Sequence, residues 1–124
     1  MNHHFNPLVS KIINCHNSEK FLDECLNSVF LQKYKKWEVI LFDNASYDKT
    51  KEIAMSYESK LRYYYIKKKV SLGKARNLAI KKVKGELIAF LDSDDLWLPD
   101  KLSEQVKYLE NSNVDVVYTD VLSK

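Results

Sequence analysis

Residues that interrupt or cross-link a backbone are scarce in this sequence. Its 124 residues include only two glycines, two prolines and two cysteines. Because 45% of the residues are hydrophobic and turn-forming residues are few, we expect a compact domain with short connections rather than a disordered chain. The length allows one domain at most and is close to the usual minimum for an open α/β sheet.

Long apolar runs and reactive cysteine motifs are also lacking. The longest apolar run covers residues 87–91, whereas a helix that spans a membrane needs about 20 apolar residues. We therefore expect no membrane span, no signal peptide and a cytoplasmic location, with attachment to the inner face of the membrane as the alternative. Cys15 and Cys25 form no CxxC pair and have no companion histidine at ligand spacing, so we expect two reduced, packed thiols.

A large excess of one charge is lacking as well. The formal net charge is +3, from 20 basic and 17 acidic residues. This mild basic excess suits a small anionic ligand and does not indicate a nucleic-acid partner.

Strand and helix patterns alternate along the whole chain. Strands are predicted at residues 8–13, 37–42, 61–66, 87–91 and 114–118. Helices are predicted between them, at residues 21–30, 49–59, 74–83 and 99–111. The expected capping residues are Asn17 or Ser18 for the first helix, Asp48 or Ser46 for the second and Gly85 for the end of the third. The alternation predicts an α/β three-layer sandwich with a mainly parallel sheet, in which the strand at 87–91 is buried on both faces.

A candidate site follows that last apolar strand, because Asp92, Asp94 and Asp95 occur within four residues. In an extended segment, residues two apart point to the same side, so Asp92 and Asp94 converge while Ser93 faces away. Such carboxylates repel one another and any phosphate, and Mg²⁺ or Mn²⁺ is the usual cation that removes this repulsion. The alternative is a solvated acidic turn whose last aspartate helps to start the next helix.

Polar residues also follow the first two predicted strands, at residues 14–17 and 43–44. In a parallel sheet the carboxyl ends of the strands share one edge, and ligands bind there near a reversal in strand order. One site at this edge is therefore expected to collect all three polar groups.

Four segments, in order, resemble the family 2 glycosyltransferases with a GT-A fold. Residues 9–17 are similar to the opening strand of that family, and residues 39–46 to its Val-Asp-Asp-Gly-Ser segment. Residues 72–77 are similar to its Gly-x-x-x-Ala-Arg-Asn turn and helix, and residues 92–102 to its Asp-x-Asp segment and following helix. The likeness covers almost the whole chain. It implies a Rossmann-like nucleotide-diphospho-sugar transferase that moves a sugar, usually from a UDP-sugar, to a hydroxyl of a saccharide or lipid-linked acceptor with inversion.

The resemblance also implies site residues. It puts His16 and Asp43 at the base, Arg76 near the base or diphosphate, Asp92 near the ribose or sugar, and Asp94 on Mn²⁺ or Mg²⁺, with Asn17 and Ser93 completing the donor-binding set. Simpler alternatives remain for three of them. Asp43 would cap the turn after the second strand, Arg76 would pair with an acid on its own helix, and His16 would cap or pack.

The sequence departs from the family pattern in two ways. Asn14-Cys15 replaces Pro-Thr, His16 replaces Tyr and Asn44-Ala45 replaces Asp-Gly, so the base pocket is altered. Members of the family also continue well beyond this length. We therefore expect residues 1–124 to form a single donor-binding domain that is C-terminally truncated and lacks the acceptor half. The catalytic base is then expected beyond Lys124, with none within the chain, and an uncovered sheet edge is expected to favour a homo-oligomer.

Two other classes of function are weighed against this hypothesis. A receiver-type signalling domain also alternates strands and helices, but it needs acids after the first strand and a phosphorylatable aspartate after the third. This chain has residues 14–17 (Asn-Cys-His-Asn) and residues 66–68 (Ile-Lys-Lys) at those places. The other alternative is a catalytically silent nucleotide-sugar-binding or assembly module.

Overall fold

The computed structural model describes residues 5–57 and 59–110, which form one parallel sheet with helices on both faces. The strands are β1 (Val9–Cys15), β2 (Trp37–Asn44), β3 (Arg62–Ile66) and β4 (Leu87–Asp92). The helices are α1 (Leu22–Phe30), α2 (Thr50–Met55), α3 (Leu72–Ile80) and α4 (Lys101–Glu110). The strand order is β3-β2-β1-β4, and all three neighbouring pairs are parallel. The predicted parallel sheet is thus confirmed, while the predicted strand at 114–118 lies outside the described residues.

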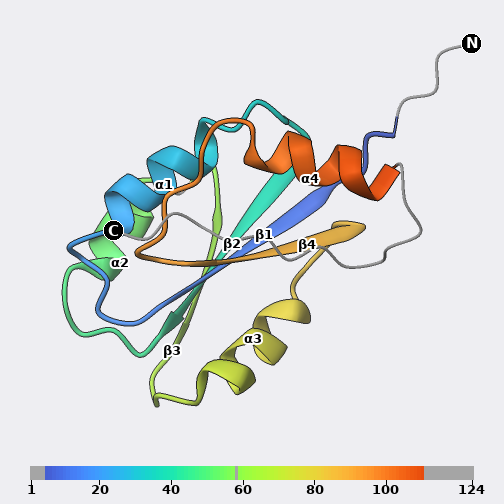
Figure 1. The fold of residues 1–124 in the computed structure, drawn as a ribbon. Helices are drawn as coiled ribbons and strands as arrows, with labels where there is room; N and C mark the ends of the chain where they lie inside the picture. The colour runs from blue at the N-terminus through green and yellow to red at the C-terminus, as the bar shows by residue number, and fades with distance from the viewer. Residues whose placement is uncertain (1–4, 58, 111–124) are drawn as a thin grey trace, which may run out of the picture.

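Two apolar layers hold the sheet between its helices. Helices α1, α2 and α4 cover one face and α3 covers the other (Figure 1). On α1 the buried side chains recur at the spacing of one helical face: Leu22, Cys25, Leu26 and Val29. On α3 the buried residues are Ala75 and Ala79, whose small side chains let that helix pack closely on Ile12 and Ile40. The chain is therefore a three-layer α/β sandwich, as predicted.

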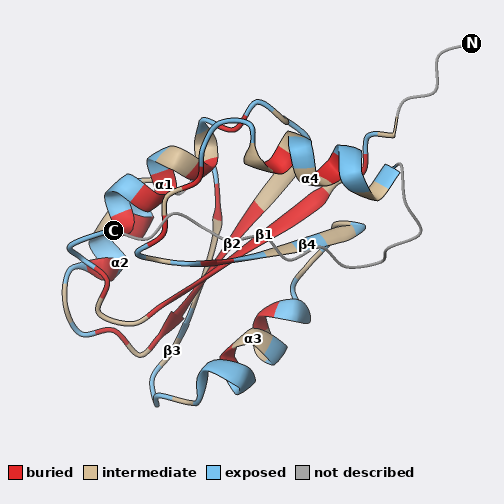
Figure 2. Ribbon diagram, viewed as in Figure 1, coloured by how far each residue is buried: buried red, intermediate tan, exposed pale blue. Residues whose placement is uncertain are grey.

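Burial is uneven across the sheet. Every residue of β1 is buried, because β1 lies between two other strands and between two layers of helices (Figure 2). In β4, by contrast, Ile88 is 40% exposed and Phe90 is 36% exposed. The prediction that this strand is buried on both faces was wrong. An apolar run cannot reveal that β4 pairs only with β1 among the described strands, or that α3 covers only part of its outer face.

Three helix boundaries differ from the predicted ones: the starts of α1 and α3 and the end of α2. Helix α1 begins after Phe21 and has no side-chain cap, so the prediction of Asn17 or Ser18 as its cap was wrong. Helix α3 begins earlier than predicted, after Ser71, whose hydroxyl accepts the Lys74 N–H at 3.2 Å. Helix α2 ends at Met55, earlier than predicted.

Two further predicted caps were also wrong. Helix α2 has Lys49 as its N-cap with no side-chain cap, rather than Asp48 or Ser46, although Asp48 Oδ1 accepts the Thr50 N–H of the first turn at 2.9 Å. Gly85 does not end α3, which stops after Ile80 with Lys81 as its C-cap. A Cβ atom at Gly85 would lie 2.6 Å from Ser10 Oγ, so glycine is needed there for a close approach to β1.

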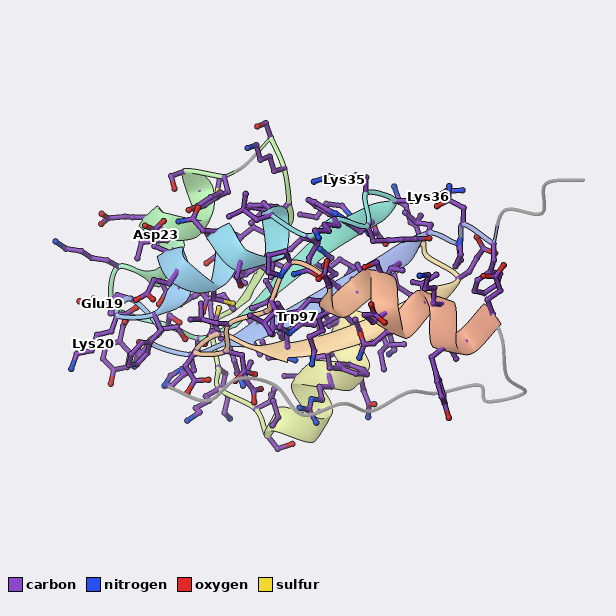
Figure 3. All side chains as sticks on the ribbon, turned by 45° about the horizontal axis from the view of Figure 1, so that its top comes forward. Glu19, Lys20, Asp23, Lys35, Lys36 and Trp97 are labelled. Carbon is purple, nitrogen blue, oxygen red and sulfur yellow. The ribbon has the colours of Figure 1, made fainter. Side chains whose placement is uncertain are left out.

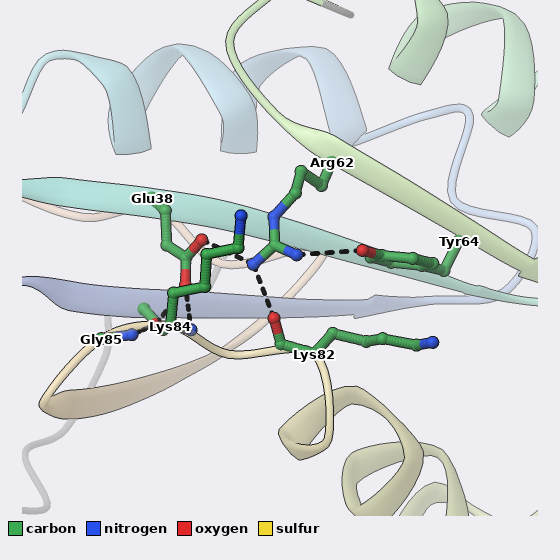
Figure 4. Close-up of polar contacts among 7 residues, drawn as sticks. Glu38, Arg62, Tyr64, Lys82, Lys84 and Gly85 are labelled. Carbon is green, nitrogen blue, oxygen red and sulfur yellow. Dashed lines mark hydrogen bonds and ion pairs between the residues drawn. The ribbon is translucent and has the colours of Figure 1, made fainter.

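One carboxylate, that of Glu38, links the strands at the amino edge of the sheet. Glu38 accepts hydrogen bonds from the Ser10 hydroxyl at 2.5 Å and the Lys84 N–H at 2.7 Å, and it pairs with the Arg62 guanidinium at 2.6 Å (Figure 4). The Gly85 N–H donates to the same Ser10 hydroxyl at 2.8 Å. Burial would raise the pKa of Glu38, but these hydrogen bonds and the Arg62 charge hold it below its usual value. Glu38 thus links three strands and the segment that enters β4.

A lysine lies inside the core of β1. Lys11 is fully buried, and its Nζ donates to the Val29 carbonyl at 2.7 Å. The same atom lies 4.0 Å from the centre of the Trp37 ring and 5.8 Å from that of Trp97. Burial, with a smaller contribution from the charge of Lys35, lowers the pKa of Lys11 to about 7. Lys11 therefore titrates near neutral pH inside the core, which its place in an apolar strand pattern did not predict.

The remaining expectations on membranes and cysteines can be compared with the structure. Within residues 5–57 and 59–110, every helix falls short of the length and apolarity that crossing a membrane requires. Cys15 and Cys25 are both free and buried, which confirms the prediction of packed thiols. Burial raises the pKa of the Cys15 thiol, and nearby acids add to that shift. The thiol therefore stays protonated and is a poor nucleophile.

Candidate metal and ligand site

The candidate site lies at the carboxyl edge of the sheet, where the strand order reverses. The chain runs from β1 outward to β2 and β3 and then returns to the other side of β1 as β4. In the register of the sheet, Asn14 lies opposite Asp92 and Cys15 lies opposite Asp43. The polar residues after the three strands therefore share one edge, as predicted from the general rule for open α/β sheets.

Three carboxylates meet at the end of β4. One oxygen from each of Asp92, Asp94 and Asp95 lies within 4.8 Å of the others. A tight turn brings them together: the Asp95 N–H donates to the Asp92 carbonyl at 3.0 Å, and Asp95 Oδ2 accepts the Asp92 N–H at 3.2 Å. The predicted convergence of Asp92 and Asp94 is confirmed, although a turn rather than an extended strand produces it. The turn also brings in Asp95. From the sequence, Asp95 belongs to the acidic run but has no predicted role as a ligand.

The electrostatics of this acidic turn (residues 92–95) are only partly compensated. Burial raises the pKa of Asp95; the hydrogen bond from the Asp92 N–H opposes the shift, and the charges of Asp92 and Asp94 add to it. Arg76 Nη2 lies 3.9 Å from Asp92 Oδ1, at the limit of an ion pair. The alternative that Arg76 pairs with an acid on its own helix is therefore wrong, because its acidic partner is on β4.

The donor atoms of the acidic turn fit a hard divalent cation. All three side chains offer carboxylate oxygens, which are the ligands that Mg²⁺ and Mn²⁺ prefer. Asp92 and Asp94 are exposed, so a hydrated ion and an anionic ligand can reach them. The nearby cations, the Arg76 guanidinium and the Lys101 ammonium, leave an excess of negative charge that a divalent cation would neutralise.

The loop after β1 holds His16 and Asn17. His16 Nδ1 lies 2.6 Å from the Asn44 carbonyl, so this nitrogen carries the proton. Its other nitrogen then accepts from the Asn17 amide at 3.3 Å. The imidazole also packs edge-on against Tyr47, with ring centres 6.1 Å apart. The packing alternative for His16 is therefore observed, and a contact of its ring with a base stays a prediction.

Asp43 is fully buried at the end of β2 and has two partners within the chain. Its Oδ1 accepts the Ser46 N–H at 3.0 Å, and its Oδ2 accepts the Tyr63 hydroxyl at 2.5 Å. Burial and the Asp43 carboxylate both raise the pKa of Tyr63, which keeps that hydroxyl a donor. Asp43 thus caps the turn after β2, as the simpler alternative expected, and its contact with a base stays a prediction.

The remaining site residues lie on the side of the site nearest β4. Ser93, predicted to bind the donor, is half-buried, and its hydroxyl lies 2.6 Å from the Ser18 hydroxyl of the loop after β1. Trp97 is 4% exposed in the layer between the helices and the sheet, and its backbone N–H donates to the Ser28 hydroxyl at 3.1 Å (Figure 3). Trp97 thus anchors the segment that follows the acidic turn.

Comparisons with known proteins agree with this geometry. A sequence profile described as glycosyl transferase family 2 matches residues 10–124. The uncharacterized glycosyltransferase RT0329 of Rickettsia typhi is 40% identical over 114 residues, which are 91% of this chain and 36% of that protein. TarS 1–349 of S. aureus, solved in complex with UDP, aligns with a TM-score of 0.77 and 33% identity over 82% of this chain and 32% of that one.

A second solved structure has the same fold. The mannosyltransferase PcManGT from Pyrobaculum calidifontis, in complex with GDP-Man and Mn²⁺, aligns with a TM-score of 0.82 and 27% identity over 88% of this chain and 34% of that one. The chain spans well under half the length of these relatives, 36% of the first and 34% of the last. The comparisons confirm the predicted GT-A type of fold and exclude the receiver-type alternative.

Proposed function

Because this chain belongs to glycosyltransferase family 2, we propose that its described residues bind the diphosphate of a nucleotide-sugar donor through Mn²⁺ or Mg²⁺. The observation that carries this proposal is the acidic turn, which gathers three carboxylates at the strand-order reversal. Three acids with one guanidinium nearby would repel a bare diphosphate, so binding through a cation is the arrangement that the charges favour.

Each residue of the site has a proposed task. Asp94, with Asp92 and Asp95, would hold the cation, which when bound neutralises charge on the departing nucleoside diphosphate. Arg76 would turn from Asp92 to a phosphate oxygen, since its Nε is buried without a hydrogen-bond partner among the described residues. The face of the His16 ring would lie against the base, with Asn17 and Asp43 shaping that end of the site.

The donor and acceptor are proposed from the family. TarS has been solved with UDP and with UDP-GlcNAc, and PcManGT with GDP-Man and Mn²⁺. We propose a UDP-sugar as donor, a saccharide or lipid-linked hydroxyl as acceptor, and inversion at the anomeric carbon. We assign no general base among the described residues, because Asp92, Asp94 and Asp95 are all engaged in the proposed cation site. Residues 1–124 are accordingly proposed to be the donor-binding part of the transferase.

Metal-dependent ligand stabilisation tests the proposal. UDP at about 100 times its dissociation constant should add roughly 2.7 kcal/mol to the free energy of unfolding when Mn²⁺ is present. With EDTA in place of Mn²⁺ the stabilisation should fall sharply. Asp94→Asn should remove the dependence on Mn²⁺ and leave the unliganded melting temperature nearly unchanged.

A matched control keeps the result specific. Asp100→Asn makes the same chemical change at an exposed acid that pairs with Lys33, outside the acidic turn, and should respond to UDP and Mn²⁺ as the parent does. Equal stabilisation by UDP in Mn²⁺ and in EDTA would overturn the cation role. A parent that UDP stabilises in neither condition would overturn donor binding itself.

A further inference from the structure

One short loop connects the two ends of the candidate site. On the side nearest β2, the Asn17 N–H donates to Ser46 Oγ at 2.8 Å, and Asn17 Oδ1 accepts the Tyr47 N–H at 2.9 Å. The next backbone N–H, that of Ser18, donates to Thr50 Oγ1 at 2.7 Å. On the opposite side the Ser18 hydroxyl meets Ser93 of the acidic turn at 2.6 Å. Ser18 is therefore the residue at which both sides of the site are joined.

The hydroxyl of Ser18 has three polar neighbours. The His16 N–H donates to it at 3.3 Å, the His16 carbonyl lies 3.4 Å away, and Ser93 Oγ lies 2.6 Å away. A serine hydroxyl has one proton to donate and accepts with its lone pairs. The 2.6 Å contact holds one proton, which either hydroxyl can supply; a proton from Ser18 makes a shorter bond there than on the His16 carbonyl at 3.4 Å.

Which hydroxyl donates in this contact decides whether the Ser93 proton is available to another acceptor. If Ser93 Oγ accepts from Ser18, its own proton is not used in that contact and can be donated elsewhere. Ser93 lies in the chain between Asp92 and Asp94, whose carboxylates form part of the proposed cation site, and it is half-buried. A diphosphate bound there would present oxygens that only accept hydrogen bonds.

We propose that Ser18 is a positioning residue for the donor. Its hydroxyl donates to Ser93, ties the acidic turn to the loops after β1 and β2, and leaves the Ser93 proton for an oxygen of the donor's diphosphate. The inference rests on the proposed function and adds a residue to it. It predicts that Ser18 affects the diphosphate end of the ligand more than the base end, where its hydroxyl makes only the longer contact with the His16 N–H at 3.3 Å.

Two ligands separate these ends. UDP in Mn²⁺ reports on the whole site, whereas uridine lacks the diphosphate and reports on the base end alone. Ser18→Ala should weaken UDP binding in Mn²⁺ by about three- to tenfold, the usual worth of one neutral hydrogen bond, and weaken uridine binding by clearly less. Ser93→Ala should give the same loss. The double variant should lose no more than either single variant, because both remove one linked pair.

Ser56→Ala is the matched control, since that hydroxyl bonds only the Ile53 carbonyl among the described residues, at the end of α2, and should leave both constants unchanged. If Ser18→Ala weakens UDP and uridine equally, or neither, the positioning role is wrong although Mn²⁺-dependent binding of UDP by the parent stands. Should Ser18→Ala fail to fold, Ser93→Ala alone decides, and unchanged UDP affinity overturns the inference. A parent without Mn²⁺-dependent UDP binding overturns both this inference and the proposed function.

Discussion

The two edges of the sheet treat their acids in opposite ways. At the amino edge, Glu38 has three partners from its own chain, and its pKa lies below the usual value. At the carboxyl edge, Asp92, Asp94 and Asp95 face one another with one guanidinium nearby, and the pKa of Asp95 lies above the usual value. The first acid is satisfied by the fold, and the other three have few partners within the described residues, which supports the proposed cation site. Partners, rather than residue type, separate a structural acid from a functional one.

Lys11 extends this comparison to a buried charge with few partners. It has one carbonyl and the faces of two indole rings, and its pKa is lowered to about 7. Between that value and the unfolded pKa of about 10.4, only the unfolded chain holds the proton, so stability rises with pH there. Lys11→Met should remove a slope of up to about 1.4 kcal/mol per pH unit and should be more stable than the parent at pH 7.

Urea unfolding at pH 6, 7, 8 and 9 measures this difference, since contributions from other groups cancel between parent and variant. Lys68→Met, at an exposed lysine that does not contribute to the shift of Lys11, is the control and should keep the slope of the parent. Parallel pH curves for the parent and Lys11→Met would show that Lys11 is charged throughout.

The satisfied acid should behave in the opposite way when it is removed. Glu38→Ala leaves Arg62 and the Lys84 N–H without their acceptor, and we expect a loss of about 2 kcal/mol in the free energy of unfolding. Asp94→Asn should cost almost nothing without metal, because it relieves repulsion in the acidic turn. Chemical denaturation of both variants compares the edges, and the less drastic Glu38→Gln should lose about half as much. Equal losses for Glu38→Ala and Asp94→Asn would remove the distinction.

Acid should affect the two edges with opposite signs, by smaller amounts. The folded pKa of Glu38 is lowered, so its contribution is present above the unfolded pKa and is lost as pH falls through the folded value. The folded pKa of Asp95 is raised, so the folded chain takes up that proton first and its contribution improves as pH falls from 7. Relative to the parent, Glu38→Gln should therefore gain stability as pH falls below about 4.3, and Asp95→Asn should lose its advantage as pH falls through the raised folded pKa of Asp95. Melting temperatures from pH 3 to 7 test both signs.

Much of the fold follows from local patterns. The spacing of apolar residues located the four described helices and the four described strands. An element that buries one face has its apolar residues at the period of a helix or of a strand. The partial exposure of Ile88 and Phe90 was not predictable, since it depends on which elements lie beside β4. The missed helix cap has a similar cause: Ser18 carries a capping side chain, but Ser93, distant in the sequence, is its partner.

The sequence predicted those site residues whose role depends on residue type. It did not predict those whose role depends on contacts with distant segments. Acids at the end of an apolar strand indicated the cation site, and the resemblance to a family added Arg76 and His16. Nothing local separates Glu38, whose partners come from three other segments, from Asp94, which has no partner among the described residues other than the acids of its own turn. The apolar pattern around Lys11 predicts that it lies in a strand, but it does not predict which side chains surround the amine.

Paramagnetic broadening by Mn²⁺ places the cation on one edge or the other. In the presence of UDP, substoichiometric Mn²⁺ should first weaken the backbone amide signals of residues 92–95 and Ser18. The amides of Lys84 and Gly85 precede β4, whose length separates the two edges by about 17 Å, and should keep most of their intensity. Asp94→Asn should abolish the selective broadening. Uniform broadening, or broadening centred on Lys84 and Gly85, would contradict a cation-bound diphosphate at the acidic turn.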